Sequence, residues 1–173
     1  MAVTQQLARV TEEYLAACRR SASASPDGDP QWDPPSSDCL DLDWAPALLE
    51  RAGEVAGLDP AQQEALVPAT DGDAELDLGF LSAPPHGIGP FGPAPTALTA
   101  DGVARVGALL AEIDPERLLA AVPQDPRKAA TLLGRAAEGL GDPRAYLRTH
   151  LTLLRRFYAQ ASRRGLLVVQ WWD

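Results

Sequence analysis

The C-terminal part of the chain joins a long amphipathic segment to an apolar run, and this pair constrains the fold most. Between residues 143 and 164, apolar side chains recur at helical spacing and arginines occupy the other side. The apolar stripe consists of Leu147, Leu151, Leu154, Tyr158 and Ala161. Gly165 follows at the position where glycine commonly ends a helix. Residues 166–172 are rich in β-branched and aromatic side chains, so they predict a buried strand after a long helix.

The N-terminal residues predict a second strand near the other end of the chain. Residues 1–10 are half apolar, and Thr11 is a favourable helix N-cap followed by Glu12 and Glu13 in the first turn. We therefore expect an α+β fold in a single domain covering residues 1–173. Its small mixed or antiparallel sheet should include the N- and C-terminal strands, packed against about five to six helices.

An Asp-Pro dipeptide recurs where helices are expected to begin. The aspartate can accept a hydrogen bond from a free N–H of the first turn, and proline fits the first helical position. The four aspartates are Asp59, Asp114, Asp125 and Asp142. We also expect Asp43 to cap a helix over residues 44–56, which Gly57 ends.

Two long irregular loops are expected, over residues 21–38 and 82–97. Prolines and aspartates interrupt regular structure in the first, where Trp32 is expected to pin the loop to the core. Prolines and glycines dominate the second, and loops of this length in compact domains are commonly functional. Between them, the weak alternation of residues 75–81 predicts a strand.

Length and composition exclude several classes of function. A chain of 173 residues with 46% hydrophobic side chains is long enough to bury a core. Its net charge of −9 disfavours nucleic-acid binding, because phosphate contact requires basic surface. No apolar run reaches the roughly 18 residues of a membrane span, and the N-terminus does not resemble a signal peptide. We therefore expect a cytoplasmic protein with no membrane association, in which Cys18 and Cys39 are free thiols.

Charge is unevenly distributed along the chain. Residues 27–77 contain 14 acidic side chains and a single basic one, whereas residues 127–164 contain nine basic and two acidic side chains. The two stretches either face each other within the domain or form a polarised surface that steers a charged partner. The sequence leaves both alternatives open.

Two segments carry a resemblance to a known family. One is Leu40-Asp41-Leu42-Asp43-x-Ala45, and the other is Tyr146-Leu147-x-x-His150 with the apolar positions that follow it. Together with the glycine-rich residues 82–95, they resemble the YfbM-like family of small bacterial proteins of unknown function. The resemblance implies an α+β fold with a small sheet packed on helices, and it implies no activity.

Candidate chemistry concentrates around His86, in the second loop. Its imidazole could act as a base or a ligand, with a pocket under the loop lined by Trp32, Phe80 and Phe91. Asp41 and Asp43 are candidate partner-binding residues. No spacing of His and Cys predicts zinc, and the acidic doublets lack the later ligands of a calcium loop, so we expect no metal and no cofactor.

These observations favour a non-enzymatic protein–protein interaction module with an acidic face that binds a basic protein partner. The alternative is a small-molecule binding protein or an enzyme, with its pocket under the Pro/Gly-rich loop around His86.

Overall fold

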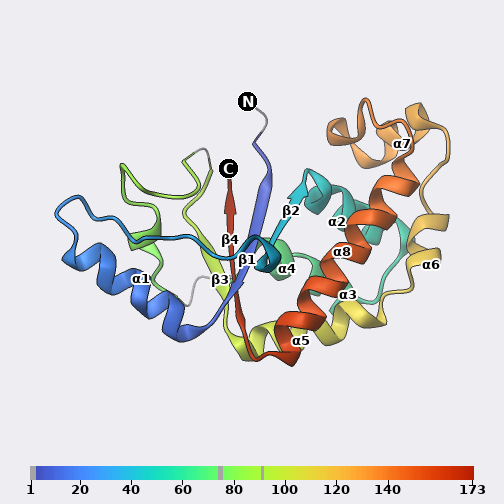
Figure 1. Cartoon of the computed structure of the whole chain (residues 1–173). Coiled ribbons are helices and arrows are strands. Elements are labelled where there is room, and N and C mark those ends of the chain that lie inside the picture. Colours follow the sequence, from blue (N-terminus) through green and yellow to red (C-terminus); the bar gives the residue numbers. More distant parts are fainter. Residues whose placement is uncertain (1–2, 74–75, 91) are drawn as a thin grey trace.

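A four-stranded antiparallel sheet divides the molecule in the computed structural model, which describes residues 3–73, 76–90 and 92–173 (Figure 1). The strand order is β2-β1-β4-β3. The strands are β1 (Gln5–Val10), β2 (Cys39–Asp43), β3 (Thr96–Leu98) and β4 (Leu167–Trp172). β1 and β4 pair along their whole length, from Gln5 opposite Trp172 to Val10 opposite Leu167. The expected α+β class and the pairing of the terminal strands are therefore confirmed.

Helices cover the two faces of the sheet unequally (Figure 1). α1 (Glu12–Ala24) lies on one face, and the other helices of the described residues lie on the opposite face. These are α2 (Ala45–Ala56), α3 (Pro60–Leu66), α4 (Pro68–Asp71), α5 (Ala100–Glu112), α6 (Pro115–Ala120), α7 (Pro126–Leu133) and α8 (Pro143–Arg163). Some are a single turn or little more, such as the four-residue α4, so the helices are more numerous than expected.

Alternation along the strands assigns the core residues to two layers. Leu7 and Val168 belong to the larger layer under α2, α5 and α8, whereas Ala8 and Val169 belong to the smaller layer under α1. This is the period-two pattern of a sheet buried on both faces. Within the described residues, we find no helix both long and apolar enough to cross a membrane.

The four Asp-Pro dipeptides all begin helices, as predicted. Each aspartate accepts a hydrogen bond from a backbone N–H two or three residues later, for example Ala145 N to Asp142 Oδ1 at 2.9 Å. The Asp43 side chain accepts no such hydrogen bond at the start of α2, so the prediction that it caps this helix is wrong. Trp44 occupies the N-cap position without a side-chain hydrogen bond, because Asp43 is the last residue of β2.

Three boundaries differ from the sequence-based expectation. The strand expected over residues 75–81 is absent from its described part, where Gly79–Leu81 forms a 3-10 turn that buries Leu78 and Leu81 together. In the first loop, α1 continues to Ala24 and Ser36–Asp38 forms another 3-10 turn. The second loop ends earlier than expected, because β3 begins at Thr96.

Candidate functional site

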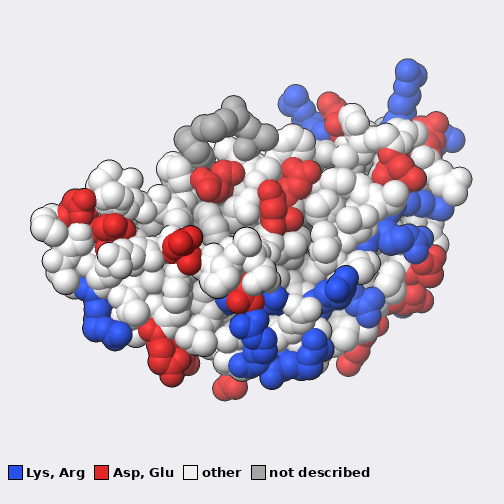
Figure 2. Space-filling model, in the orientation of Figure 1, with Lys and Arg blue, Asp and Glu red and all other residues white. Residues whose placement is uncertain are grey.

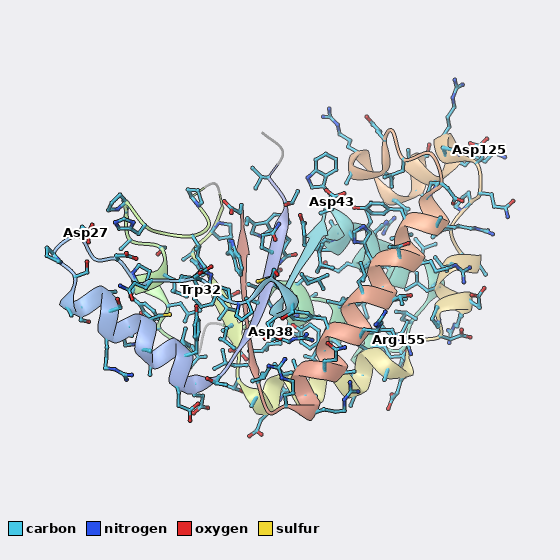
Figure 3. All side chains as sticks on the ribbon, viewed as in Figure 1. Asp27, Trp32, Asp38, Asp43, Asp125 and Arg155 are labelled. Atoms are coloured by element: carbon cyan, nitrogen blue, oxygen red, sulfur yellow. The ribbon has the colours of Figure 1, made fainter. Side chains whose placement is uncertain are left out.

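The structure places the candidate residues on both sides of the sheet. Asp41 and Asp43 lie on the edge strand β2, next to α8, while Trp32, Phe80 and His86 lie on the side of α1. Figure 3 shows Asp43 at the end of β2, well separated from Trp32 and Asp27. Phe91 lies outside the described residues. The candidates therefore do not form one site.

The two segments that carry the family resemblance meet in space. The Tyr146 hydroxyl donates a hydrogen bond to Asp43 Oδ2 at 3.0 Å and accepts one from the backbone N–H of Trp44 at 3.3 Å. One helical turn further along α8, the His150 ring packs against Tyr146 with centroids 4.3 Å apart. We call Asp41, Asp43, Trp44, Tyr146 and His150 the β2–α8 cluster.

The backbone of the β2–α8 cluster adopts an uncommon conformation at Asp43. Its φ is 52°, in the left-handed region that non-glycine residues seldom occupy. The backbone N–H of Asp43 donates to Asp41 Oδ1 at 2.7 Å, a local turn that aspartate favours. Strained residues of this kind concentrate at binding and catalytic sites, where neighbouring contacts hold them.

Burial shifts the pKa of both titratable rings of the cluster, Tyr146 and His150. Burial, and then the hydrogen bond to Asp43, raise the pKa of the Tyr146 hydroxyl well above its usual range. Burial lowers the pKa of His150, against the opposing effect of Asp43 and Asp41. His150 Nδ1 is buried without a hydrogen-bond partner among the described residues.

Trp44 presents its ring to solvent beside these carboxylates. Its side chain is 44% exposed, which is unusual for so large an apolar group. The indole Nε1–H donates to the Val3 carbonyl at 2.9 Å, and this bond fixes the ring over the end of β1. Asp41, on the same strand end, is exposed.

Charges are segregated on the face of the molecule seen in Figure 2. Acidic side chains gather over the upper ends of the central strands, and basic side chains gather below, over the C-terminal part of α8. An ion pair joins the acidic and basic stretches of sequence, between Arg164 Nη1 and Asp38 Oδ1 at 2.5 Å. The two stretches therefore meet at this ion pair, and the steering of a charged partner by the polarised surface stays a prediction.

On the other face, Trp32 holds its loop against the core as expected. Its ring makes edge contacts with Tyr14 and Trp171, with centroids 5.7 and 5.9 Å apart. Phe80 packs under the Arg19 guanidinium, whose Cζ lies 4.9 Å from the ring centroid. These contacts account for both aromatic side chains as packing groups.

His86 lies on the surface, in contact with the first loop. Its Nε2 is 2.9 Å from Asp27 Oδ2, and both side chains are exposed. The hydrogen bond that the His86 ring donates to Asp27 raises the pKa of His86, while the bonds that Asp27 accepts from Ser25 and then from His86 lower the pKa of Asp27 to about 2. A hollow of about 400 Å³ lies within the second loop, bounded by prolines and glycines such as Pro84 and Gly87, and His86 does not line it. We call this the loop hollow.

A second hollow, which the sequence did not indicate, lies at the end of the sheet. It has a volume of about 270 Å³ and is enclosed by the ends of β1, β3 and β4, by α4 and by the second loop. We call it the sheet-end pocket. Its lining residues are Gln5, Thr70, Asp71, Pro93, Ala94, Thr96, Gln170, Trp171 and Trp172. The sequence signal that could have indicated this pocket is a glutamine within each of two largely apolar strands, Gln5 in β1 and Gln170 in β4.

Metal-ligating groups are dispersed. In the part of the chain that the structure describes, no three His, Cys, Asp or Glu side chains are placed to hold a metal ion. Cys18 and Cys39 are free thiols, and burial raises the pKa of each.

The architecture defines a class of α+β domain, in which one helix and two long loops cover one face of a four-stranded antiparallel sheet and the remaining helices cover the other. Among solved structures, the chain is similar to YfbM from Escherichia coli, a protein of unknown function. The two share 16% identity over 96% of this chain and 98% of that one, with a TM-score of 0.55. The YfbM-like fold that the sequence resemblance implied is therefore confirmed. No protein-family model and no curated protein matches the chain.

Proposed function

We propose that the chain is a cytoplasmic, non-enzymatic protein–protein interaction module, whose acidic face binds a basic segment of a partner protein. The observation that carries the proposal is the exposed Trp44 ring beside Asp41 and Asp43 on an edge strand. Tryptophan is enriched among the residues that dominate binding energy at interfaces. Neighbouring carboxylates would steer a basic segment toward it.

The rigidity of the β2–α8 cluster supports this function. Hydrogen bonds to Tyr146 and to the Val3 carbonyl hold Asp43 and Trp44 in place before any partner arrives. Preorganised contact groups lose less conformational entropy on binding, so more of the interaction energy appears as affinity.

Affinity capture from a lysate of the native host, at low and moderate salt, tests the proposal. The wild-type chain should retain a basic protein that moderate salt releases, and Trp44→Ala and Asp41→Asn should each lose it. Leu153→Ala is the matched control, because Leu153 is another exposed apolar side chain, on α8. Equal retention by wild type and Trp44→Ala would refute the assignment of this face.

A second candidate function is small-molecule binding under the second loop. The observation that favours it is the loop hollow, with a volume of about 400 Å³. A ligand that uses His86 must compete with Asp27 for the imidazole. Thermal-shift screening of wild type and His86→Ala tests this: a ligand of the expected kind stabilises the wild type alone, and a ligand that stabilises both equally excludes a role for His86.

A further inference from the structure

The sheet-end pocket has two buried amide side chains in its wall. Gln5 on β1 and Gln170 on β4 are 1% and 2% exposed. The strands that carry them are adjacent, with Leu7 opposite Gln170 and Gln5 opposite Trp172, and both side chains face α4. Glutamine is seldom so deeply buried in a sheet, because its amide must be hydrogen-bonded at both ends to offset the loss of water.

The orientation of both amides is fixed by their partners. Gln5 Nε2 donates to the Thr70 carbonyl, and Gln170 Nε2 donates to the Pro68 carbonyl at 3.0 Å. A backbone carbonyl can only accept, so the NH₂ group of each amide must face α4. The oxygens Gln5 Oε1 and Gln170 Oε1 are therefore directed away from these α4 carbonyls. Neither oxygen has a hydrogen-bond partner among the described residues.

A third acceptor group stands at the rim of the same pocket. Asp71 is the last residue of α4, and its carboxyl makes no hydrogen bond or ion pair within the part of the chain that is described. Partial desolvation raises the pKa of this carboxyl. The backbone around Asp71 is held in place by Thr96, whose hydroxyl donates to the Asp71 carbonyl at 2.5 Å.

The remaining walls are apolar or aromatic. Pro93 and Ala94 of the second loop close one side, and Trp172, whose neighbour Trp171 turns its ring to the opposite face of the sheet, closes another. The loop rests directly on β4, because a Cβ placed on Gly92 would lie 2.6 Å from Trp172 Cβ. An indole beside a group of acceptors suits a cation, whose charge is attracted to the face of the ring.

We propose that the sheet-end pocket is a binding site for a primary ammonium group on a short alkyl chain. Such a group has three N–H donors, matching in number the two amide oxygens and the carboxylate. Its alkyl chain would lie against Pro93, Ala94 and Trp172. The site is separate from the interaction face around Trp44, and it does not depend on the function proposed for that face.

Titration of the ¹⁵N-labelled full chain, followed by NMR, tests the proposal. The probes are n-butylammonium and Nα-acetyl-lysine amide, which present the same ammonium as a free amine and as a lysine side chain. Either should shift the indole N–H signal of Trp172 and the side-chain amide signals of Gln5 and Gln170. The probe with the higher affinity shows whether the ammonium group belongs to a free amine or to a lysine side chain. Shifts confined to Trp44, or no saturable shift with either probe, would overturn the proposal.

Two further probes separate charge from hydrogen bonding. Tetramethylammonium carries the charge without N–H donors, and n-butanol fits the same space without the charge. Both should bind at least about tenfold more weakly than n-butylammonium, because charge-assisted hydrogen bonds supply the discrimination. Equal binding of tetramethylammonium would show that the unpartnered amide oxygens are not the ligands.

A conservative variant tests the carboxylate at the rim. Asp71→Asn keeps the shape and should weaken n-butylammonium binding by at least about tenfold. Glu138→Gln removes an exposed carboxylate beyond α7 and should bind like the wild type. Unchanged affinity in Asp71→Asn, with the fold shown intact by its NMR spectrum, would remove Asp71 from the site. Equal weakening in both variants would indicate attraction to net charge and would likewise contradict the proposal.

Discussion

Arg9 and Asp38 form an ion pair almost closed to solvent. Arg9 Nε lies 2.7 Å from Asp38 Oδ1, with the two side chains 8% and 14% exposed. Arg9 also donates to the Ser37 carbonyl at 2.8 Å, and its guanidinium lies over the Phe157 ring. The pair therefore joins β1, the end of the first loop and α8.

Replacing Arg9 with leucine should destabilise the fold strongly. Loss of Arg9 leaves the nearly buried Asp38 carboxylate with the exposed Arg164 as its remaining cation, and breaking such a buried pair costs about 3 kcal/mol. Arg164 also pairs with Asp38, but its side chain is 51% exposed, so Arg164→Leu should have a much smaller effect. Urea unfolding of both variants measures the difference, and equal losses would contradict this account of the pair.

The same pair predicts how stability changes in acid. Hydrogen bonds from Arg164 and then Arg9 hold the pKa of the Asp38 carboxyl below its usual range. The folded state therefore binds this proton less readily than the unfolded state. The contribution of Asp38 to stability is full above about pH 4, the ordinary range of aspartate, and is lost as the pH falls through the lowered pKa. The difference in unfolding free energy between wild type and Asp38→Asn should shrink over that range; a constant difference would exclude this linkage.

Local signals in the sequence predicted much of the fold. Asp142 and the other aspartates before proline act through a neighbouring N–H, so their effect can be deduced without the tertiary structure. The terminal strands follow from composition and alternation. The strand expected at residues 75–81 was wrong because Leu78 and Leu81 are buried together at a spacing that alternation does not describe. Asp43 was assigned as a cap because nothing local indicates that β2 continues through it.

The candidate site was predictable only in part, because it depends on contacts between distant segments. The sequence selected Asp41 and Asp43, and the resemblance selected Tyr146 and His150, but 103 positions separate the Tyr146 hydroxyl from Asp43. Likewise, the sheet-end pocket exists because Gln5 and Gln170 lie on neighbouring strands from opposite ends of the chain. Local propensity carries no information about such pairing.

The N-cap of α8 provides a test of the Asp-Pro motif. Asp142→Ala removes the acceptor for the Ala145 N–H and should cost about 1 kcal/mol of unfolding free energy. Asp142→Ser retains a side-chain oxygen at the cap and should recover most of that loss. Chemical denaturation of the two variants makes the comparison. If serine is as destabilising as alanine, the aspartate stabilises the helix by something other than capping.

The contact between the second loop and β4 requires glycine at position 92. A Cβ there would lie 2.6 Å from Trp172 Cβ, so Gly92→Ala must displace either the loop or the strand end. We expect a loss of about 1 kcal/mol or more, as for other overpacked positions. Gly141→Ala is the control, because a Cβ at Gly141 has no atom within 4 Å. Similar thermal unfolding midpoints for the two variants would show that the loop yields freely.

The His86–Asp27 contact should contribute little to the fold despite its short distance. Both side chains are exposed and both lie on loops, so solvent screens the pair and ordering the loops opposes it. The hydrogen bond that His86 donates to Asp27 raises the pKa of His86, so any contribution is full below the ordinary histidine pKa and is lost as the pH rises through the raised value. His86→Ala should therefore keep the thermal midpoint of the wild type at neutral pH, with at most a small decrease in mild acid. A large decrease at neutral pH would show that His86 supports the core, and it would contradict the surface role assigned to this side chain.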